Sequence, residues 1–312
     1  MDILVVLEDN RGSLHRMSKE AIVGAQKMGG SISVLAIGNN ANGLANELSN
    51  IDISEVITVN HDLVSTYSAD GYSEVVKQVI EAESPSTILI GHSYQTRDYI
   101  PRVSTKLDIP FIPDIISMEN GLVKQILNSK LNATISAATD QKILSFQSSA
   151  FSEEAMMPGN CSSRSFNVDL DSSLVRSESE DPFQEAAADV DLESAELIIS
   201  VGRGIEKEDN IPIVFELAKV MGAEVGASRP VVDSGWLPSF RQIGSSGQTV
   251  SPKLYLALGI SGAIQHVVGM KGSKNILAIN KDADAPIFEI ADYAVIGDVL
   301  EIIPKLTETL KG

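Results

Sequence analysis

Short apolar runs that alternate with helix-forming segments constrain the fold of this chain more than any other feature. In the first half the apolar runs cover residues 3–7, 32–37, 56–59 and 87–90. In the second half they cover residues 197–201, 224–227, 254–258, 275–279 and 293–296. Strands joined through helices pair in parallel, because each helix returns the chain to the same edge of the sheet. The sequence therefore predicts an α/β protein with mainly parallel sheets flanked by helices.

The segments between these runs have the apolar spacing of helices. Helices are expected over residues 18–27, 41–48, 73–83, 98–106, 211–221, 287–291 and 300–310, with a further helix opening near Ser261. Strands of a less regular kind are expected between residues 115 and 149. The alternation is cleanest in the second half of the chain.

Length and composition favour two domains. The chain has 312 residues, more than one domain usually contains, and its 43% apolar content can fill two cores. Residues 178–196 hold eight acidic side chains and no basic one, which is typical of a solvated connection. We therefore expect domains at 1–185 and 186–312, with a hinge near residue 185.

Charge and cysteine content exclude several classes of function. A formal net charge of −18 argues against nucleic acid as a partner, because phosphate neutralisation needs clustered Lys and Arg. Cys161 is the single cysteine, so no internal disulfide is possible. No apolar run approaches the roughly 20 residues that span a bilayer. We expect a protein that is not itself membrane-embedded, located in the cytoplasm, or in the mitochondrial matrix if a presequence has been removed.

Polar residues and glycines follow each strand of the second half. These residues are Gly202, Arg203 and Gly204; Ser228 and Arg229; Gly259, Ser261 and Gly262; Asn280; and Asp298. Because ligands bind outside the carboxyl ends of strands in open parallel sheets, these side chains are expected to converge on one crevice.

The residue types in this predicted crevice suit a phosphate-bearing aromatic cofactor. Glycines before a helix allow close backbone approach, and the helix amides attract phosphate, which predicts a phosphate seat around Ser261. Arg203 and Arg229 carry planar cations suited to a pyrophosphate or a flavin ring. Asn280 and Asp298 offer polar atoms to ribityl, ribose or adenine groups. The loop 241–248, and Gln265 and His266 one turn into the helix, are expected nearby.

Each of these residues also has a plain structural interpretation. A strand-end glycine is often only part of a turn, a lone histidine is often a hydrogen-bonded structural residue, and Arg203 could pair with an acid. The joint placement at one sheet edge favours a binding site.

Several familiar motifs are absent. Lys207 stands where the third glycine of a dinucleotide fingerprint would follow Gly202 and Gly204, so a GxGxxG site is not expected. There is no phosphate-binding loop of the Gly-Lys-Ser/Thr kind, and the scattered histidines form no metal-ligand spacing. No nucleophile elbow surrounds Ser261, so hydrolysis is disfavoured. We assign no catalytic residue and no metal ligand.

Several segments, taken together, resemble the α subunit of electron transfer flavoprotein. They are SVGRG at 200–204, VGASRP at 225–230, QIGSSG at 242–247, GISGAIQHVVGM at 259–270, AINKD at 278–282, APIF at 285–288 and ADY at 291–293. The resemblance covers the second half densely. It is looser in the first half, at residues 3–8 and 107–116.

The resemblance implies a heterodimer with a β subunit, in which the first domain packs on the partner and the second holds one non-covalent FAD. The positions that match the family's FAD contacts are Arg203, Ser228, Arg229, Gln242, Ile243, Ser245, Ser246, Ser261, Gln265, His266, Asn280 and Asp298. By resemblance, Arg229 lies against the isoalloxazine, Ser246 bonds near flavin N5, and His266 faces the N1/C2 carbonyl edge. Positive charge there would favour an anionic, one-electron-reduced flavin.

Two positions depart from the family pattern. Ser246 stands where many members have threonine, which keeps the hydroxyl, and Ser245 stands where a longer glutamine is frequent, so a contact made by that amide is not carried over.

The function implied is electron carriage and not conversion of a substrate. Electrons would come from dehydrogenases, of the acyl-CoA type used in fatty acid oxidation, and pass to a quinone oxidoreductase or another acceptor. One alternative is a bifurcating version that oxidises NADH with a second FAD in the β subunit. Another is a nucleotide-binding module without a redox role.

Overall fold

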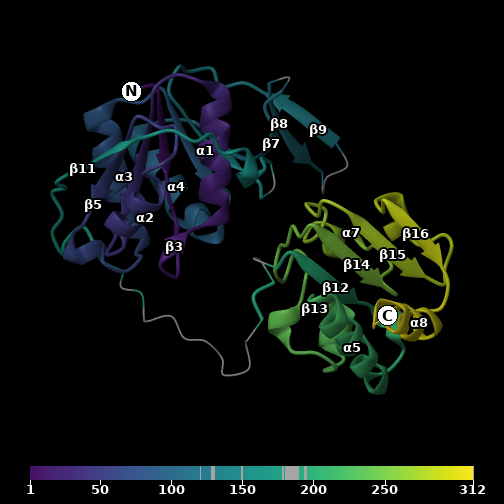
Figure 1. Ribbon diagram of the computed structural model, residues 1–312. Coiled ribbons are helices and arrows are strands. Elements are labelled where there is room, and N and C mark those ends of the chain that lie inside the picture. Colours follow the sequence, from purple (N-terminus) through teal and green to yellow (C-terminus); the bar gives the residue numbers. More distant parts are fainter. Residues whose placement is uncertain are drawn as a thin grey trace. The chain divides into compact units, whose positions relative to one another are not determined.

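The computed structural model of the chain describes residues 1–119, 121–127, 131–148, 150–177, 179, 190–192 and 195–311. By contacts within the chain, it divides into unit 1, Met1–Pro182, and unit 2, Phe183–Gly312 (Figure 1). Most of the acidic segment 178–196, with the expected boundary at residue 185, lies outside the described residues. That boundary stays a prediction.

Unit 1 is built on a nine-stranded sheet in which most strands are parallel. Its order is β11-β5-β4-β1-β6-β10-β7-β8-β9. The strands are β1 Ile3–Val6, β4 Ile32–Ile37, β5 Glu55–Val59, β6 Thr87–Gly91, β7 Phe111–Ser117, β8 Leu122–Ile126, β9 Leu131–Ile135, β10 Lys142–Phe146 and β11 Ser162–Ser165. Only the pairs β7–β8 and β8–β9 are antiparallel, which accounts for the less regular pattern expected between residues 115 and 149. A separate small hairpin joins β2 Asp9–Asn10 to β3 Ser13–Leu14.

Helices cover both faces of the unit 1 sheet. They are α1 Arg16–Met28, α2 Ala41–Glu47, α3 Ala69–Glu83 and α4 Tyr94–Leu107. Apolar residues of α1 and α2 pack into one core, and those of α3 and α4 pack into the core on the other face. The central strand β1 contributes to both cores and is buried along its whole length, as expected of a parallel strand with two covered faces.

Unit 2 is a five-stranded sheet in which every described pair is parallel. Its order is β13-β12-β14-β15-β16, from strands β12 Leu197–Val201, β13 Glu224–Ala227, β14 Leu254–Leu258, β15 Ile276–Asn280 and β16 Tyr293–Ile296. The α/β prediction, with two mainly parallel sheets flanked by helices, is therefore confirmed.

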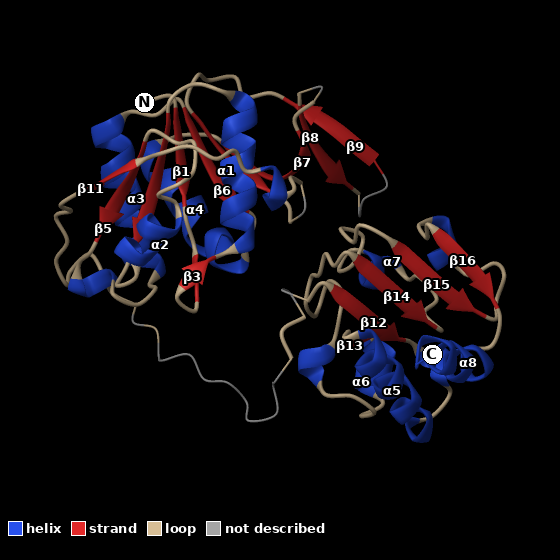
Figure 2. Cartoon of the chain, viewed as in Figure 1, coloured by secondary structure: helices blue, strands red, loops and turns tan. Residues whose placement is uncertain are grey.

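The two faces of the unit 2 sheet are covered differently. Helices α5 Ile211–Met221 and α8 Val299–Lys311 lie together on one face (Figure 2), and a short helix, α6 Arg229–Asp233, packs into the same core. The other face is covered by the chain around residues 243–270 and by the 3-10 turn η6 Pro286–Glu289. Helix α5 begins with a proline in its first turn and ends at Gly222 in the left-handed conformation, two strong helix boundaries that matched the expected range.

Two expected helices of unit 2 are shorter than the sequence pattern indicated. The helix expected to open near Ser261 is α7 Ile264–Val267, a single turn that starts three residues later. The helix expected over 287–291 is the 3-10 turn η6. Glycines at 259, 262 and 269 restrict the helix to the few residues between them. No described helix is long and apolar enough to cross a membrane.

Candidate functional site: a glycine-lined crevice in unit 2

The candidate site lies at the carboxyl edge of the unit 2 sheet, where the strand order reverses between β12 and β14. In open parallel sheets this reversal opens a crevice between loops that leave in opposite directions. Residues 202–204 follow β12, and residues 259–262 follow β14. The two segments are joined there, because the Gly204 amide donates to the Gly259 carbonyl at 3.0 Å.

The backbones of these two segments approach too closely for side chains. A Cβ built on Gly259 would lie 2.5 Å from the Cα of Gly204, and the reverse distance is also 2.5 Å. Gly259 in addition has a φ of 62°, which L side chains rarely adopt. The glycines that were expected to let the backbone approach a ligand therefore also bring the two loops together.

The two cations expected at the site are both exposed. The Arg203 guanidinium forms no ion pair with a described residue, so the structure does not support its interpretation as an ion-paired arginine, and only its carbonyl is bonded, to the Glu206 amide at 2.9 Å. Arg229 begins the short helix after β13, and its Nε lies 3.3 Å from Asp233 Oδ2, where both side chains are largely exposed. The two arginines are exposed cations at one sheet edge of a chain whose formal net charge is −18.

The loop from Gln242 to Gln248 is closed by its own hydrogen bonds. The Gln242 Nε2 donates to the carbonyl and the hydroxyl of Ser246, both at 3.0 Å, and the Ser245 amide donates to the Gln265 carbonyl at 2.7 Å. Gly244, with a φ of 140°, passes so close to Gln265 that a Cβ would lie 2.6 Å from that carbonyl oxygen. Ser245 and Ser246 are exposed, and the loop that carries them is held by the bonds from Gln242 to Ser246 and from Ser245 to Gln265.

His266 is not exposed to the crevice. Its side chain is buried, its Nε2 lies 2.8 Å from the Tyr255 hydroxyl, and its Nδ1 lies 3.1 Å from the Ile243 carbonyl oxygen. Burial lowers the pKa of His266 to about 4, partly opposed by its bond to Ile243. His266 is therefore neutral at pH 7 and brings no positive charge to the site. Gln265, its neighbour, is exposed.

Asn280 and Asp298 already have structural partners. The Asn280 amide donates to the Ile260 carbonyl at 2.9 Å and its oxygen accepts from the Asp282 amide, which ties the end of β15 to the loop after β14. Asp298 Oδ1 accepts from the Leu300 amide at 2.8 Å at the start of α8. Both side chains are half-buried, so part of each faces solvent.

Of the twelve residues predicted to hold the cofactor, the structure exposes or half-exposes eight at or near this sheet edge. These are Arg203, Arg229, Ser245, Ser246, Ser261, Gln265, Asn280 and Asp298. The other four, Ser228, Gln242, Ile243 and His266, are buried. The phosphate site predicted around Ser261 does not lie at the start of a long helix. Helix α7 is a single turn that begins at Ile264, so its dipole has little effect at Ser261. The Gly259 amide donates to the Ile279 carbonyl at 2.9 Å, so a ligand at this loop would have to use the amides of residues 260–263.

These residues fit an FAD. Gly204 and Gly259 let the loops after β12 and β14 meet at the sheet edge, the Arg203 and Arg229 side chains are exposed for the pyrophosphate or the ring, and the exposed serines offer hydroxyls. Which residue contacts which part of the cofactor stays a prediction.

Sequence reasoning missed Tyr255. It reads as an ordinary aromatic residue of a buried strand, yet its hydroxyl is buried with the histidine as a partner. The signal was available in principle, because a tyrosine in the middle of a fully buried strand needs a hydrogen-bond partner.

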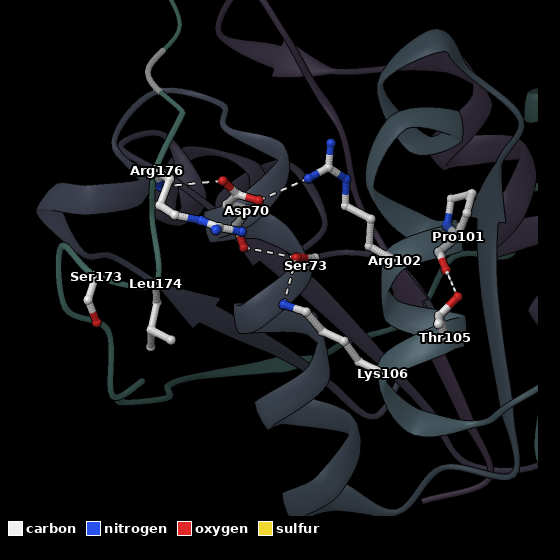
Figure 3. Close-up of a pocket in the computed structure, with 9 residues that line it drawn as sticks. All are labelled: Asp70, Ser73, Pro101, Arg102, Thr105, Lys106, Ser173, Leu174 and Arg176. Carbon is white, nitrogen blue, oxygen red and sulfur yellow. Dashed lines mark hydrogen bonds and ion pairs between the residues drawn. The ribbon is translucent and has the colours of Figure 1, made fainter.

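Unit 1 contains a separate open cavity of about 750 Å³ between α3, α4 and the chain at 173–176 (Figure 3). Two of its cations are matched by carboxylates, with Arg102 Nη1 2.9 Å from Asp70 Oδ1 and Lys106 Nζ 3.1 Å from Glu74 Oε2. Asp70 also accepts from the Arg176 amide at 3.3 Å, so it holds this part of the chain against α3. None of the predicted cofactor residues lies here. No group of three or more described His, Cys, Asp or Glu residues is arranged to hold a metal ion.

Comparison with known proteins gives matches along nearly the whole chain. A family model described as an electron transfer flavoprotein domain matches residues 3–169, and one described as an electron transfer flavoprotein FAD-binding domain matches residues 191–271. The second match includes the crevice loops up to α7 and stops before Asn280 and Asp298.

Curated relatives extend over the full length. Electron transfer flavoprotein subunit alpha of Thermoanaerobacterium thermosaccharolyticum is 36% identical over 322 residues, covering 99% of this chain and 98% of that protein. The protein of the same name from Bacillus subtilis is 35% identical, covering 99% and 97%. The acryloyl-CoA reductase electron transfer subunit beta of Anaerotignum propionicum is 33% identical, covering 99% and 95%.

Proposed function

The chain belongs to the electron transfer flavoprotein α-subunit family, and we propose that it carries electrons between a dehydrogenase and an acceptor on an FAD held at the unit 2 sheet edge. The C-terminal part of the chain is an FAD-binding domain. The observation that carries the placement is the strand-order reversal between β12 and β14, where two glycine loops meet and Arg203 and Arg229 are exposed.

The bound FAD supplies the redox chemistry, and the residues of this chain bind and orient it. Arg203 and Arg229 provide fixed positive charge for phosphate oxygens or for a ring that becomes negative on reduction. Ser246, held by Gln242, presents a hydroxyl from a loop whose path does not depend on the ligand. Because His266 is neutral and buried, it orients the loop and contributes no charge.

A β subunit is the expected partner, and we propose that unit 1 packs against it. The name of the Anaerotignum propionicum relative links one such protein to an acyl-CoA-type reductase, which supports an acyl-CoA dehydrogenase or a related enzyme as the electron donor here. A quinone oxidoreductase is our proposed acceptor. The cytoplasmic address expected from the sequence stays a prediction.

The test is to co-express the chain with its β subunit and measure the bound flavin. We expect one FAD held through unit 2, and reduction of that FAD by a reduced acyl-CoA dehydrogenase. An Arg203→Met/Arg229→Met variant should lose FAD while the heterodimer still assembles, as judged by size-exclusion chromatography. A purified complex that holds a nucleotide but no flavin would contradict the proposal, and two flavins reduced directly by NADH would identify the bifurcating form.

A further inference from the structure

A buried polar contact lies directly behind the exposed crevice loop. The Tyr255 hydroxyl is 2.8 Å from His266 Nε2, and His266 Nδ1 is 3.1 Å from the Ile243 carbonyl oxygen. Tyr255 and Ile243 are at most 1% exposed, and His266 is 6% exposed. The contact therefore joins the beginning of β14, the single turn α7 and the start of the 242–248 loop.

The chemistry of the partners determines where the protons are. A carbonyl oxygen can only accept, so Nδ1 of His266 must carry hydrogen to bond Ile243. In a neutral imidazole the other nitrogen is then an acceptor, and the Tyr255 hydroxyl must donate to Nε2. The hydrogen bonds of the three groups therefore indicate a neutral His266 that carries its proton on Nδ1.

The surroundings of the histidine keep it neutral. Its neighbours in this core are mainly apolar side chains of β12, β14 and β15 and of the chain at 243–270. Tyr255 is the titratable group in contact with it, and burial raises the pKa of that phenol far above its usual range. Ser200, buried on β12, lies close enough to lower the phenol pKa against the effect of burial, but it makes no hydrogen bond of normal geometry.

The loop that this contact supports is the one predicted to face the flavin. Ile243 begins it, Ser245 bonds to Gln265 next to the histidine, and Ser246 is held by Gln242. A change in the orientation of the His266 ring would move the Ile243 carbonyl and with it the exposed serines.

We propose that Tyr255 is a positioning residue, which anchors Nε2 of His266 and so fixes the orientation of the imidazole ring and, through it, the path of the 242–248 loop beside the flavin. This rests on the proposed function for the flavin itself, but the hydrogen bonding of His266 is a property of the protein with or without FAD. Tyr255 has no exposed atom through which it could contact the cofactor directly.

The test uses the heterodimer with ¹⁵N-labelled histidine and long-range ¹H–¹⁵N spectra, with the His266 signals assigned by their loss in His266→Gln. The chain contains four histidines, which keeps the spectra simple. In the wild type we expect one Nδ1–H tautomer from pH 8 to 5. In Tyr255→Phe we expect Nδ1 to stay protonated, because the Ile243 carbonyl is unchanged, and the Nε2 signal to move downfield, because that nitrogen no longer accepts a hydrogen bond. A wild type with an Nε2–H or rapidly averaging histidine would overturn the proposal.

FAD affinity is the second measurement. Leaving one buried acceptor without its donor should weaken FAD binding about tenfold in Tyr255→Phe. In a His266→Leu background the same change should have little further effect, because both residues act through one contact. The proposal would be overturned if the losses of FAD affinity caused by Tyr255→Phe and by His266→Leu were fully additive in the double variant.

Tyr293→Phe is the matched control. It removes a tyrosine hydroxyl from the same sheet, at a side chain that is 64% exposed on β16, and should leave both the His266 Nε2 signal and FAD affinity unchanged. If the wild-type heterodimer binds no FAD, the proposed function fails while the histidine spectra still decide the role of Tyr255.

Discussion

The two units use the same kind of parallel sheet but have chemically opposite carboxyl edges. In unit 1 the strand order reverses between β1 and β6, where Glu8 follows β1 and Ser93 follows β6. In unit 2 it reverses between β12 and β14, where glycines and Arg203 follow the strands. Topology alone would predict a ligand crevice in both units.

The unit 1 edge is filled by its own side chains. Ser93 donates its hydroxyl hydrogen to the Glu8 carboxylate, and the Glu8 amide cannot donate to a ligand because it already donates to the Ser18 hydroxyl of α1 at 2.9 Å. The His15 amide, at the start of the same helix, donates to the Glu8 carbonyl at 3.0 Å. Burial raises the pKa of Glu8, with the charge of His15 and the bond from Ser93 acting the other way.

From this comparison we propose that the residue types at two strand ends decide which sheet edge can hold a phosphate-bearing cofactor. A carboxylate at the reversal point repels phosphate and uses the nearby amides and hydroxyls itself. Glycine at the same point leaves the backbone free to approach a ligand, and arginine attracts it. The following predictions test this difference, starting with the largest expected effect.

Gly259→Ala should lower the stability and the FAD affinity of unit 2 more than any other change considered. A left-handed φ costs an alanine about 1.5 kcal/mol, and overlap of the new Cβ with Gly204 adds about 2 kcal/mol or more. We expect loss of FAD binding and a lower free energy of unfolding, measured by urea denaturation of the heterodimer with Trp236, the one tryptophan of this chain, as reporter.

Gly222→Ala provides the control for backbone strain. Gly222 has nearly the same φ, 65°, but a Cβ there meets nothing within 4 Å. We expect only the backbone cost, about 1.5 kcal/mol, with FAD binding retained. Equal losses in the two variants would mean that the approach of Gly204 to Gly259 has no role in the site.

Acid should act on the two units in opposite directions through His266 and Glu8. The pKa of His266 is about 4 in the folded chain and near 6.5 when unfolded, so the unfolded chain binds the proton first. Its contribution to the stability of unit 2 is complete above pH 6.5, falls by about 1.4 kcal/mol per pH unit below that, and is lost below pH 4. Glu8 has a raised pKa, so its contribution to unit 1 is present below its unfolded pKa and is lost as pH rises through its folded pKa.

Urea unfolding between pH 4 and 8 checks this pair of effects. His266→Gln should flatten the pH dependence of unit 2, and Glu8→Gln should remove the gain of unit 1 on acidification. Unit 1 also contains His92, whose pKa is lowered mainly by burial, so Glu8→Gln is judged against the wild type. A wild-type unit 2 that is equally stable at pH 4.5 and 7 would show that His266 is not a buried neutral histidine.

Arg229→Met tests the charge difference between the edges. Loss of a charge-assisted contact should weaken FAD binding by about 2 kcal/mol, which is roughly a thirtyfold loss of affinity. Arg102→Met in unit 1 is the matched control, because that arginine is also exposed but is already paired with Asp70 at 2.9 Å. Isothermal titration of the apo heterodimer with FAD measures the affinity of both variants. Equal affinity of Arg229→Met and Arg102→Met would place the flavin away from Arg229.

The sequence predicted the sheet class and the strands of unit 2 well because buried parallel strands carry a continuous apolar signal. It overestimated α7, since the GISGAIQHVVGM segment has the apolar content of a longer helix while its glycines restrict the helix to one turn. It identified His266 as a candidate residue but did not predict that its side chain points into the core. The partner that holds it there, Tyr255, lies eleven residues away on a strand. Side-chain direction depends on such long-range contacts, which no local pattern contains.

Asp233→Asn should have the smallest effect. The Arg229–Asp233 pair lies 3.3 Å apart with both side chains largely exposed, so its contribution to stability should stay under about 1 kcal/mol. Its loss frees Arg229 from a competing carboxylate, and we expect FAD to bind about two- to threefold more tightly at low salt, with the gain reduced in high salt. Glu206→Gln, which removes an exposed partner 3.0 Å from Lys281, is the control and should leave FAD affinity unchanged. Weaker binding in Asp233→Asn would mean that the carboxylate orients Arg229 for the flavin, so that even the favourable edge of unit 2 depends on one acidic residue.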